Sequence, residues 1–359
     1  MRRLAFVGWL RVFLIAVVVA HHAAQAYGPT ADQWPVEDPA KAEWFGAFFA
    51  LNATYFMGFF FLIAGYFTGS SYDRKGGAAY VRDRLVRLGV PLLFFAFIVF
   101  PLFIYYQPGQ VTRFVSLYVT DYIGHWNIVV GHLWFVEQIL VYGLLYALWR
   151  TFRPQAESAL PPPNYWTVLF YVLALGIVGV LVRIAYPQDV WVHVLWLVPV
   201  EPAHLPQHLS LFVIGIVAGR GDWFNKIPAR MAWWFPVGVA AFALALAVNA
   251  LQGRSPALLA FQPLWGFFEA FVCVGVILGS TVLFRTYCNR PGPWLDRLDG
   301  NVYGVYLIHW FVVLAIQAAI LNLAASATAK FAIVTVLALA VSFALSVSLR
   351  ILPAVRRVV

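Results

Sequence analysis

The stretch Leu4–Tyr27, LAFVGWLRVFLIAVVVAHHAAQAY, decides the fold class, because its length and apolar character are those of a helix that crosses a membrane. Two kinds of residue in it do not suit hydrocarbon: Arg11, and the adjacent His21 and His22. A charge at bilayer depth costs at least about 3 kcal/mol on insertion scales, so an ionisable group there is a candidate for function. The stretch therefore predicts a transmembrane helix that carries functional side chains.

Helical geometry distinguishes the two histidines. Each residue turns an α-helix by roughly 100°, so the eleven steps from Arg11 to His22 end about 20° past three full turns. Ten steps place His21 about 80° away from Arg11. Arg11 and His22 therefore share a face of the predicted helix and are separated along its axis by roughly 16 Å. Two simpler interpretations remain open: Arg11 extends to the membrane surface, and His22 is a packed polar residue near a helix end.

The composition assigns the chain to the integral membrane proteins. Of its 359 residues, 62% are hydrophobic and 11% are charged, whereas soluble domains carry about 25% charged residues. Cys273 and Cys288 lie on one predicted helix, so we expect no disulfide framework. The fold class that follows is all-α and polytopic, with residues 1–359 forming one membrane domain and no separate soluble domain.

Ten transmembrane helices are predicted, since each span needs about 20 apolar residues and must satisfy its own backbone in lipid. Their approximate ranges are 4–27, 44–70, 85–106, 131–149, 165–186, 204–220, 231–251, 259–284, 301–322 and 330–351. The sixth is the weakest prediction, because Pro199, Pro202 and Pro206 interrupt the apolar stretch around its start. Residues 190–207 are better explained as an interfacial or re-entrant segment.

The positive charges support an even number of spans with both termini in the cytoplasm. This topology places 18 of the 24 Lys and Arg residues on the inner side and 5 on the outer side, with Arg11 inside the first span. A cleavable signal peptide is a weaker alternative for the first span. Its charged start would be Arg2 and Arg3, but Arg11 and the histidines interrupt the apolar centre. We expect the bilayer as a partner and no nucleic acid.

A basic cluster opens the third span in the stretch 82–95, RDRLVRLGVPLLFF. Arg84 and Arg87 are three residues apart and so neighbours on one α-helical face, with Arg82 close by. Guanidinium groups bind phosphate in a bidentate manner, although arginines also mark the inner ends of helices. In the span before it, Gly65 and Gly69 predict close helix packing.

Further ionisable residues lie inside later spans. His132 opens the fourth span and Glu137 lies about 7 Å deeper, where a carboxylate needs a cationic partner or a raised pKa. We interpret Glu137, and less strongly Glu269 in span eight, as the partner of a histidine or an arginine. A structural buried hydrogen bond is the alternative for each. His309 in span nine lies too deep for an aromatic belt, unlike the two tyrosines before it.

The trio Glu201, His204 and His208 has a spacing that metal ligands can have. Pro202 and Pro206 disturb a regular helix through it. We therefore expect no metal site there, and interpret the trio as polar residues that line the outer surface.

Five features in order resemble the membrane-bound acyltransferase 3 family. They are Arg, ten residues and His in the first span, FFFLIAGYF in the second, Arg-x-x-Arg at the third, HLWF at the fourth and YGVYLIH near the end. Within the family, GYFTG, RLVRLGVPLLF and HLWFV look most like the glucan biosynthesis protein C branch. The resemblance covers nearly the whole chain.

The resemblance implies a ten-span enzyme of the bacterial inner membrane that transfers an acyl group, acetyl or succinyl for example, from cytoplasmic acyl-coenzyme A. The acceptor would be a hydroxyl of an extracytoplasmic glycan or glycolipid. Arg11 and His22 match the family's first-span pair, and Arg84 and Arg87 match its donor-binding motif. His132 and His309 match positions of less certain role. No bound cofactor is implied beyond the donor substrate.

The residues fit such a reaction. Arginines at the inner mouth would hold the phosphates, and the roughly 16 Å from Arg11 to His22 is comparable to an extended pantetheine arm. His22 would act as general base, and Arg11 or a tyrosine would stabilise the oxyanion. A covalent acyl-histidine is a less favoured variant. The alternative from another class is a transporter or flippase of an anionic or glycolipid substrate, which would also explain intramembrane charges.

Overall fold

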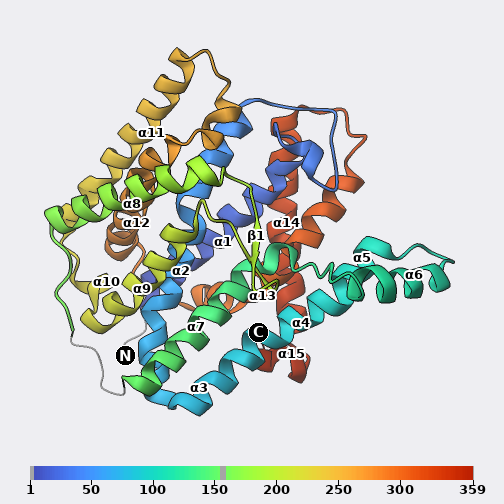
Figure 1. The fold of residues 1–359 in the computed structure, drawn as a ribbon, viewed down its shortest axis with the longest axis horizontal. Coiled ribbons are helices and arrows are strands. Elements are labelled where there is room, and N and C mark those ends of the chain that lie inside the picture. Colours follow the sequence, from blue (N-terminus) through green and yellow to red (C-terminus); the bar gives the residue numbers. More distant parts are fainter. Residues whose placement is uncertain (1–3, 154–158, 359) are drawn as a thin grey trace. The chain divides into compact units, whose positions relative to one another are not determined.

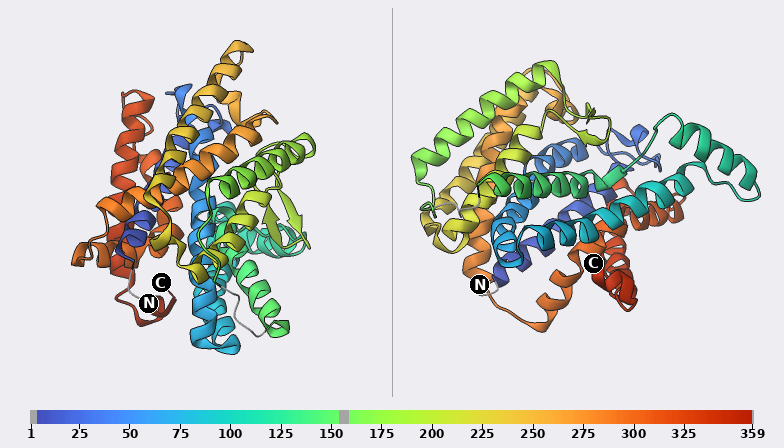
Figure 2. Two further views of the ribbon diagram at one scale, coloured as in Figure 1. Left: turned by 90° about the vertical axis from the view of Figure 1, so that its left-hand side faces the viewer. Right: turned by 60° about the horizontal axis from the view of Figure 1, so that its bottom comes forward.

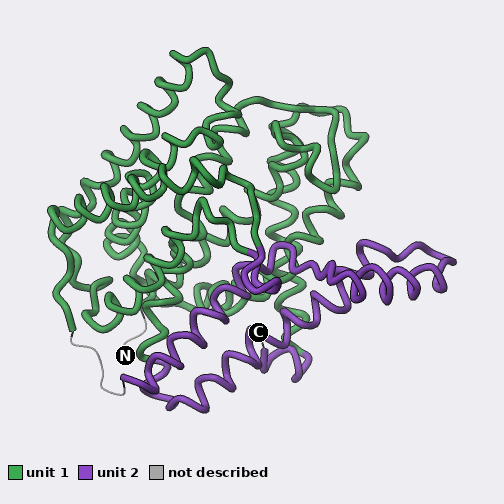
Figure 3. The backbone as a smooth tube through the Cα atoms, viewed as in Figure 1, with its two compact units in different colours: residues 1–70, 157–192, 200–351 green, residues 71–156, 193–199, 352–359 purple. Residues whose placement is uncertain are grey.

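The computed structural model describes residues 4–153 and 159–358, and it divides them into two compact units. Unit 1 contains residues 1–70, 157–192 and 200–351, and unit 2 contains residues 71–156, 193–199 and 352–359 (Figure 3). Arg2 and Arg3, which contributed to the inner charge in the topology prediction, lie outside the described residues.

Helices make up most of the described chain, which confirms the all-α class (Figure 1). In unit 1 the long helices are α1 (Ala5–Gln25), α2 (Trp44–Lys75, ending in unit 2), α8 (Tyr165–Ala185), α9 (Leu205–Gly221), α11 (Trp234–Leu251), α12 (Trp265–Tyr287), α13 (Pro293–Ala319) and α14 (Ala327–Leu349). Its short elements are η1 (Ala31–Gln33), α10 (Trp223–Lys226), η6 (Ala229–Trp233) and η7 (Pro256–Phe261). Unit 2 contains α3 (Gly77–Arg84), η2 (Leu85–Gly89), α4 (Val90–Phe94), η3 (Phe95–Val99), α5 (Phe100–Tyr105), α6 (Val111–Leu117), η4 (Tyr118–Ile123), η5 (Gly131–Leu133), α7 (Trp134–Phe152) and α15 (Pro353–Val358).

Nine helical segments within the described ranges are long and apolar enough to cross a membrane, and they correspond to nine of the ten predicted spans. The sixth predicted span is α9, whose 17 residues fall short of the roughly 20 that a span needs. Pro206 stands in its first turn, where a missing N–H is tolerated, so the helix starts only after the proline-rich stretch.

Contacts within unit 1 show that α9 runs opposite to α8, as the predicted sixth span would. It runs antiparallel to α8, because Tyr171 meets Ser210 while Arg183 meets His204. Helix α12 is antiparallel both to α8 and to α11, with which it lies side by side in both views of Figure 2. Helices α8 and α11 therefore run the same way, and α9 is the helix that returns the chain between them.

Glycine packing holds α9 against α2. A Cβ atom on Gly65 would lie 2.1 Å from the carbonyl oxygen of Phe212, and one on Gly215 would lie 2.3 Å from that of Leu62. Only glycine permits such an approach of two backbones, so the predicted packing role of Gly65 is confirmed. Gly76, with φ 78°, separates α2 from α3.

The third predicted span is longer than expected and is not a regular α-helix. Helical structure runs from Gly77 to Tyr105, with π-helical turns at η2 and η3 that end two residues before Pro91 and Pro101. A proline has no N–H and its ring clashes with the carbonyl of residue i−4, and a π-turn moves that carbonyl aside. The prolines were visible in the sequence, but the ten-span prediction treated them as ordinary apolar residues.

The region 190–200 contains the only strands among the described residues. Strands β1 (Val192–Val194) and β2 (Val198–Val200) form a hairpin whose turn residues Leu195 and Trp196 have φ of 53° and 57°. A positive φ at both central residues is typical of a tight two-residue hairpin turn. This short hairpin is the form taken by the segment that was predicted to be interfacial or re-entrant.

Candidate active site

Helices α1 and α13 lie side by side and hold the candidate site (Figure 1). The Arg11 guanidinium is 3.0 Å from an Asp299 carboxylate oxygen, and His22 Nδ1 is 2.8 Å from His309 Nε2. The residue numbers of the two contacts increase together along both helices, from Arg11 with Asp299 to His22 with His309, so the helices are parallel. Arg11 and His22 thus face the same neighbour, which agrees with the shared helical face.

The hydrogen bonds of the histidine pair assign its protons. His309 Nδ1 is 2.7 Å from the carbonyl oxygen of Tyr306, which can only accept, so Nδ1 carries a hydrogen. In a neutral pair His309 Nε2 is then the acceptor, and His22 Nδ1–H donates to it. The lone pair of neutral His22 is left on Nε2, which makes this nitrogen the basic atom of the pair.

A loop between α1 and α2 covers His22 with an indole ring. The Trp34 ring is stacked on the His22 imidazole, with centroids 5.7 Å apart and planes at 15°. Trp34 Nε1–H donates to Gln317 Oε1 at 2.8 Å, and Gln317 Nε2 donates to the carbonyl oxygen of Ala23 at 3.1 Å. One glutamine on α13 therefore connects the loop to the helix that carries His22.

The same loop is fixed to α14 by a buried ion pair. Lys330 Nζ lies 2.8 Å from Asp38 Oδ2, and both side chains are almost fully buried. Lys330 also donates to the carbonyl oxygen of Leu321 at 2.9 Å. The topology prediction counted Lys330 only among the five outer charges, and in the structure its side chain anchors the loop that bears Trp34.

His21 lies in different surroundings from His22. Its ring is 5.1 Å from those of Phe49 and Phe56 and 6.5 Å from that of Phe48, all on α2. The predicted angular separation of the two histidines is thus confirmed, since one faces α13 and the other an aromatic cluster.

A second buried polar cluster joins α8, α12 and the start of α9. Arg183 donates to Glu269, whose other oxygen lies 3.0 Å from His204 Nε2. His204 Nδ1 lies 2.6 Å from Glu201 Oε2. Burial alone would raise the pKa of Glu201, but the charge and hydrogen bond of His204 outweigh it and lower the pKa to about 2. Glu269 thus has the cationic partner that the sequence predicted, and the partner is Arg183 together with His204.

This arrangement also explains the metal-like spacing in the sequence. His204 Nδ1 is hydrogen-bonded to the Glu201 carboxylate, and Nε2 lies 3.0 Å from a Glu269 oxygen and 3.3 Å from Arg183 Nη2. The arginine cation beside Nε2 disfavours a metal ion at this ring. His208 is stacked on the rings of Phe61 and His204. Within residues 4–153 and 159–358, no group of three or more His, Cys, Asp or Glu side chains has the geometry of a metal site.

The remaining predicted site residues belong to unit 2. The interpretation of Glu137 as an ion-pair partner is wrong for the described residues, because none of them binds it and its buried Oε2 has no hydrogen bond. Glu137 lies in the first turn of α7, whereas His132 precedes the helix in η5 and packs edge-on against Phe95 and Phe100. Because the chain changes from a 3-10 helix at His132 to an α-helix at Glu137, the two side chains face different neighbours.

Arg82, Arg84 and Arg87 also need a correction. The prediction that Arg84 and Arg87 are neighbours on one α-helical face is wrong, because η2 begins directly after Arg84 and contains Arg87. A π-turn rotates less per residue than an α-turn, so the two side chains are further apart around the axis. Arg84 is partly buried over the ring of Tyr80, and Arg82 and Arg87 are exposed.

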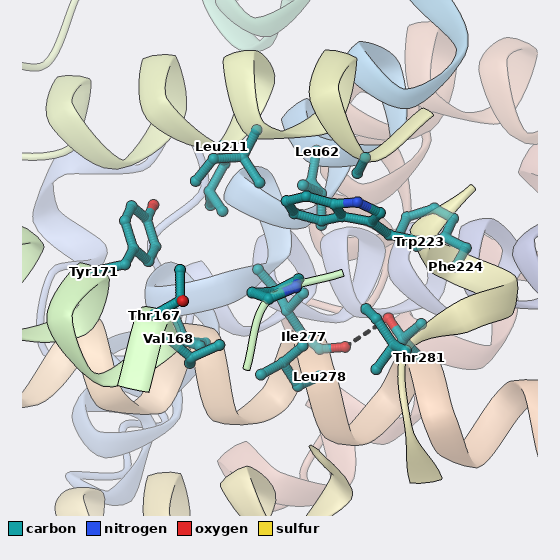
Figure 4. Close-up of a pocket in the computed structure, with 15 residues that line it drawn as sticks. Leu62, Thr167, Val168, Tyr171, Leu211, Trp223, Phe224, Ile277, Leu278 and Thr281 are labelled. Carbon is teal, nitrogen blue, oxygen red and sulfur yellow. Dashed lines mark hydrogen bonds between the residues drawn. The ribbon is translucent and has the colours of Figure 1, made fainter. Parts of the chain in front are cut away.

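A separate cavity of about 230 Å³ in unit 1 does not have the chemistry of an acid–base site (Figure 4). It is lined mostly by aliphatic and aromatic side chains, among them Leu62, Leu211 and Leu278. Its hydroxyl groups are engaged: Thr281 donates to the Ile277 carbonyl oxygen, and Tyr171 is 2.9 Å from Ser210. The histidine pair on α1 and α13 remains the candidate active site.

Several residues of the site were not identified from the sequence. Asp299 precedes His309 by ten residues, close to the eleven from Arg11 to His22, and nearly equal spacing on two parallel helices brings both pairs together. That match was a usable signal for Asp299. Trp34 and Gln317 had no such signal, because their roles depend on how a loop folds back over the helix.

The fold and the site describe a multi-pass membrane protein with a histidine pair held between two parallel helices. A family model described as an acyltransferase domain matches residues 4–347, nearly the whole chain. The protein therefore belongs to the acyltransferase 3 family and is a membrane acyltransferase. Comparisons with curated proteins and with solved structures found no match.

Proposed function

We propose that the protein is an O-acyltransferase that moves an acyl group from cytoplasmic acyl-coenzyme A to a hydroxyl group of an extracytoplasmic glycan or glycolipid. The bacterial inner membrane is the location that suits this reaction. The motif resemblance to the glucan biosynthesis protein C branch favours a glycan acceptor and a small acyl group such as acetyl or succinyl.

The observation that carries the proposal is the hydrogen-bonded pair of His22 and His309. The order of donors, from His22 Nδ1 to His309 and from His309 Nδ1 to the Tyr306 carbonyl oxygen, leaves a basic nitrogen on His22. His309 has no exposed surface, so its ring is held in place by packing and orients His22. A positioned imidazole is the commonest general base in enzymes that activate a hydroxyl group.

In the proposed reaction His22 Nε2 takes the proton of the acceptor hydroxyl as its oxygen attacks the thioester carbonyl carbon. The carbon–sulfur bond of the tetrahedral intermediate then breaks, and the sulfur leaves as a thiolate that takes the proton from the His22 imidazolium. The products are an ester and free coenzyme A, and the histidine returns to its neutral form. No covalent acyl-histidine is required by these steps.

Arg11 has a different role from the one expected. It lies roughly 16 Å from His22 along α1, and this distance favours a tyrosine, the other candidate, as the group that stabilises an oxyanion beside that histidine. Its ion pair with Asp299 holds the N-terminal halves of α1 and α13 together. One third of the Arg11 side chain stays exposed, and we propose that this part faces the passage of the donor's thiol arm, while Arg84 and Arg87, with Arg82 nearby, bind its phosphates.

Reconstituted vesicles test this function directly. The purified protein is inserted into lipid vesicles, labelled acyl-coenzyme A is supplied on one side, and a glycan acceptor on the other. Labelled acceptor should accumulate with the wild-type protein and not with His22→Ala. Accumulation of intact donor on the far side instead would support the transporter alternative.

A further inference from the structure

Two buried polar atoms at the start of the third helical segment lack hydrogen-bond partners among the described residues. Tyr80 on α3 has no exposed surface, and its hydroxyl group has no partner. Arg84, one turn further on, has a buried Nε–H that is also without a partner. Its guanidinium carbon lies 5.0 Å from the centroid of the Tyr80 ring. Buried donors without acceptors lower the stability of a protein, so their presence at one place requires an explanation.

The helix opposite approaches these atoms closely with a glycine. Gly143 on α7 faces them, and a Cβ atom there would lie 3.1 Å from the Tyr80 hydroxyl oxygen and about 4 Å from Arg84 Nε. The acids of this end of unit 2 are engaged with other cations, since Asp83 pairs with Lys75 at 2.7 Å and Asp73 with Arg150 at 2.9 Å. The two donors are thus placed for an acceptor that comes from outside the chain.

Helix α15 brings further positive charge to the same place. It packs against η2, which starts directly after Arg84. Its six residues include Arg356 and Arg357, both exposed. The topology prediction counted these two arginines only among the 18 inner charges. A segment distant in sequence therefore adds two cations beside the Arg-x-x-Arg motif.

We propose that α15 is part of the donor site, and that Tyr80, Arg84, Arg356 and Arg357 together bind the phosphates of the nucleotide end of coenzyme A. The inference rests on the proposed function, which makes acyl-coenzyme A the donor. Phosphate oxygens accept hydrogen bonds from both neutral and charged donors, which matches a set made of one hydroxyl group and three guanidinium groups.

Calorimetric titration of the full-length protein in lipid nanodiscs with coenzyme A tests the site. The double variant Arg356→Ala, Arg357→Ala should bind at least about 10-fold more weakly than wild type, with a smaller dependence of affinity on salt, because ion pairs with phosphates are screened. The matched control is Arg230→Ala, Arg290→Ala, which removes two exposed arginines that belong to unit 1. It should bind as wild type does.

The variant Tyr80→Phe distinguishes a role of the hydroxyl group in binding coenzyme A from a role in protein stability. It keeps the ring under Arg84 and removes the hydroxyl group, so the thermal stability of the ligand-free protein should be kept or raised, since a buried unpaired group is lost. The affinity for coenzyme A should fall about 3-fold to 10-fold. A loss of ligand-free stability with unchanged affinity would make the hydroxyl group structural and overturn its place in the site.

The outcomes distinguish this inference from the proposed function. If Arg84→Ala, Arg87→Ala abolishes binding of coenzyme A while the α15 variant equals its control, the helix is not part of the site and the proposed donor stands. If the wild-type protein does not bind coenzyme A at all, the proposed donor is wrong and this site is wrong with it.

Discussion

The histidine pair His22–His309 and the histidine His204, all in unit 1, differ in what their ring nitrogens contact. His22 and His309 donate along a chain that ends on a carbonyl oxygen, so each ring can be neutral. His204 lies between the carboxylates of Glu201 and Glu269, and two negative charges beside one imidazole favour its doubly protonated, charged form. Burial is similar for His309 and His204, at 0% and 5% exposed. The difference therefore comes from the partners and not from the depth.

The comparison separates a chemical role from a structural one. A general base needs a lone pair, which the His22 arrangement provides and the His204 arrangement removes. The charged cluster instead holds α8, α9 and α12 together through alternating charges from Arg183 to Glu201. In the sequence, His22 was the candidate general base, whereas Glu201, His204 and His208 were interpreted as polar residues that line the outer surface.

The largest effect is expected for His22→Ala. Loss of a general base typically costs about 10²–10⁴ in rate, so acyl transfer in vesicles should fall by that factor while expression and coenzyme A affinity are kept. The control is His21→Ala, which removes the neighbouring ring from the aromatic cluster of α2 and should cost far less. Equal losses for the two variants would contradict the assignment of the base.

Arg183→Leu should show the structural character of the other cluster. Removing one partner of a buried ion pair costs about 3–5 kcal/mol, because Glu269 would keep its charge with one partner fewer. The free energy of unfolding in detergent should fall by this amount, while the transfer rate per folded molecule stays within a few-fold of wild type. A large loss of rate at unchanged stability would assign this cluster to the reaction and remove the contrast with His22.

His309→Phe is expected to have an intermediate effect. It fills the space of the ring but removes the acceptor of the His22 hydrogen bond, and loss of groups that orient a functional histidine costs about 10–100-fold in metal enzymes. The maximal rate should fall and the KM for the donor should stay unchanged. His309→Gln retains an acceptor and should recover part of the rate. A KM that rises instead would place His309 in binding.

The sequence predicted the helical class, most of the spans and the shared face of Arg11 and His22, because these depend on composition and helical periodicity. It did not predict the π-turn between Arg84 and Arg87, since that follows from how the chain accommodates Pro91. The sequence also did not predict ion-pair partners that come from distant elements of the chain. The topology prediction counted Lys330 and Arg183 among the five outer charges, and only the folded chain places them against Asp38 and Glu269.

The smallest effect, which tests the charge of His204, is expected in the dependence of stability on pH. The pKa of Glu201 is lowered from 4.5 to about 2 in the folded protein. A carboxyl group with a lowered pKa stabilises the fold above its unfolded pKa, and this contribution is lost as the pH falls from about 4.5 towards 2. Glu201→Gln lacks the titrating group, so its melting temperature should be lower than that of wild type at pH 7, and the two should converge by a few degrees as the pH falls through this window. Thermal unfolding in detergent across the window measures the convergence, and a constant difference would mean that Glu201 is not held ionised by a charged His204.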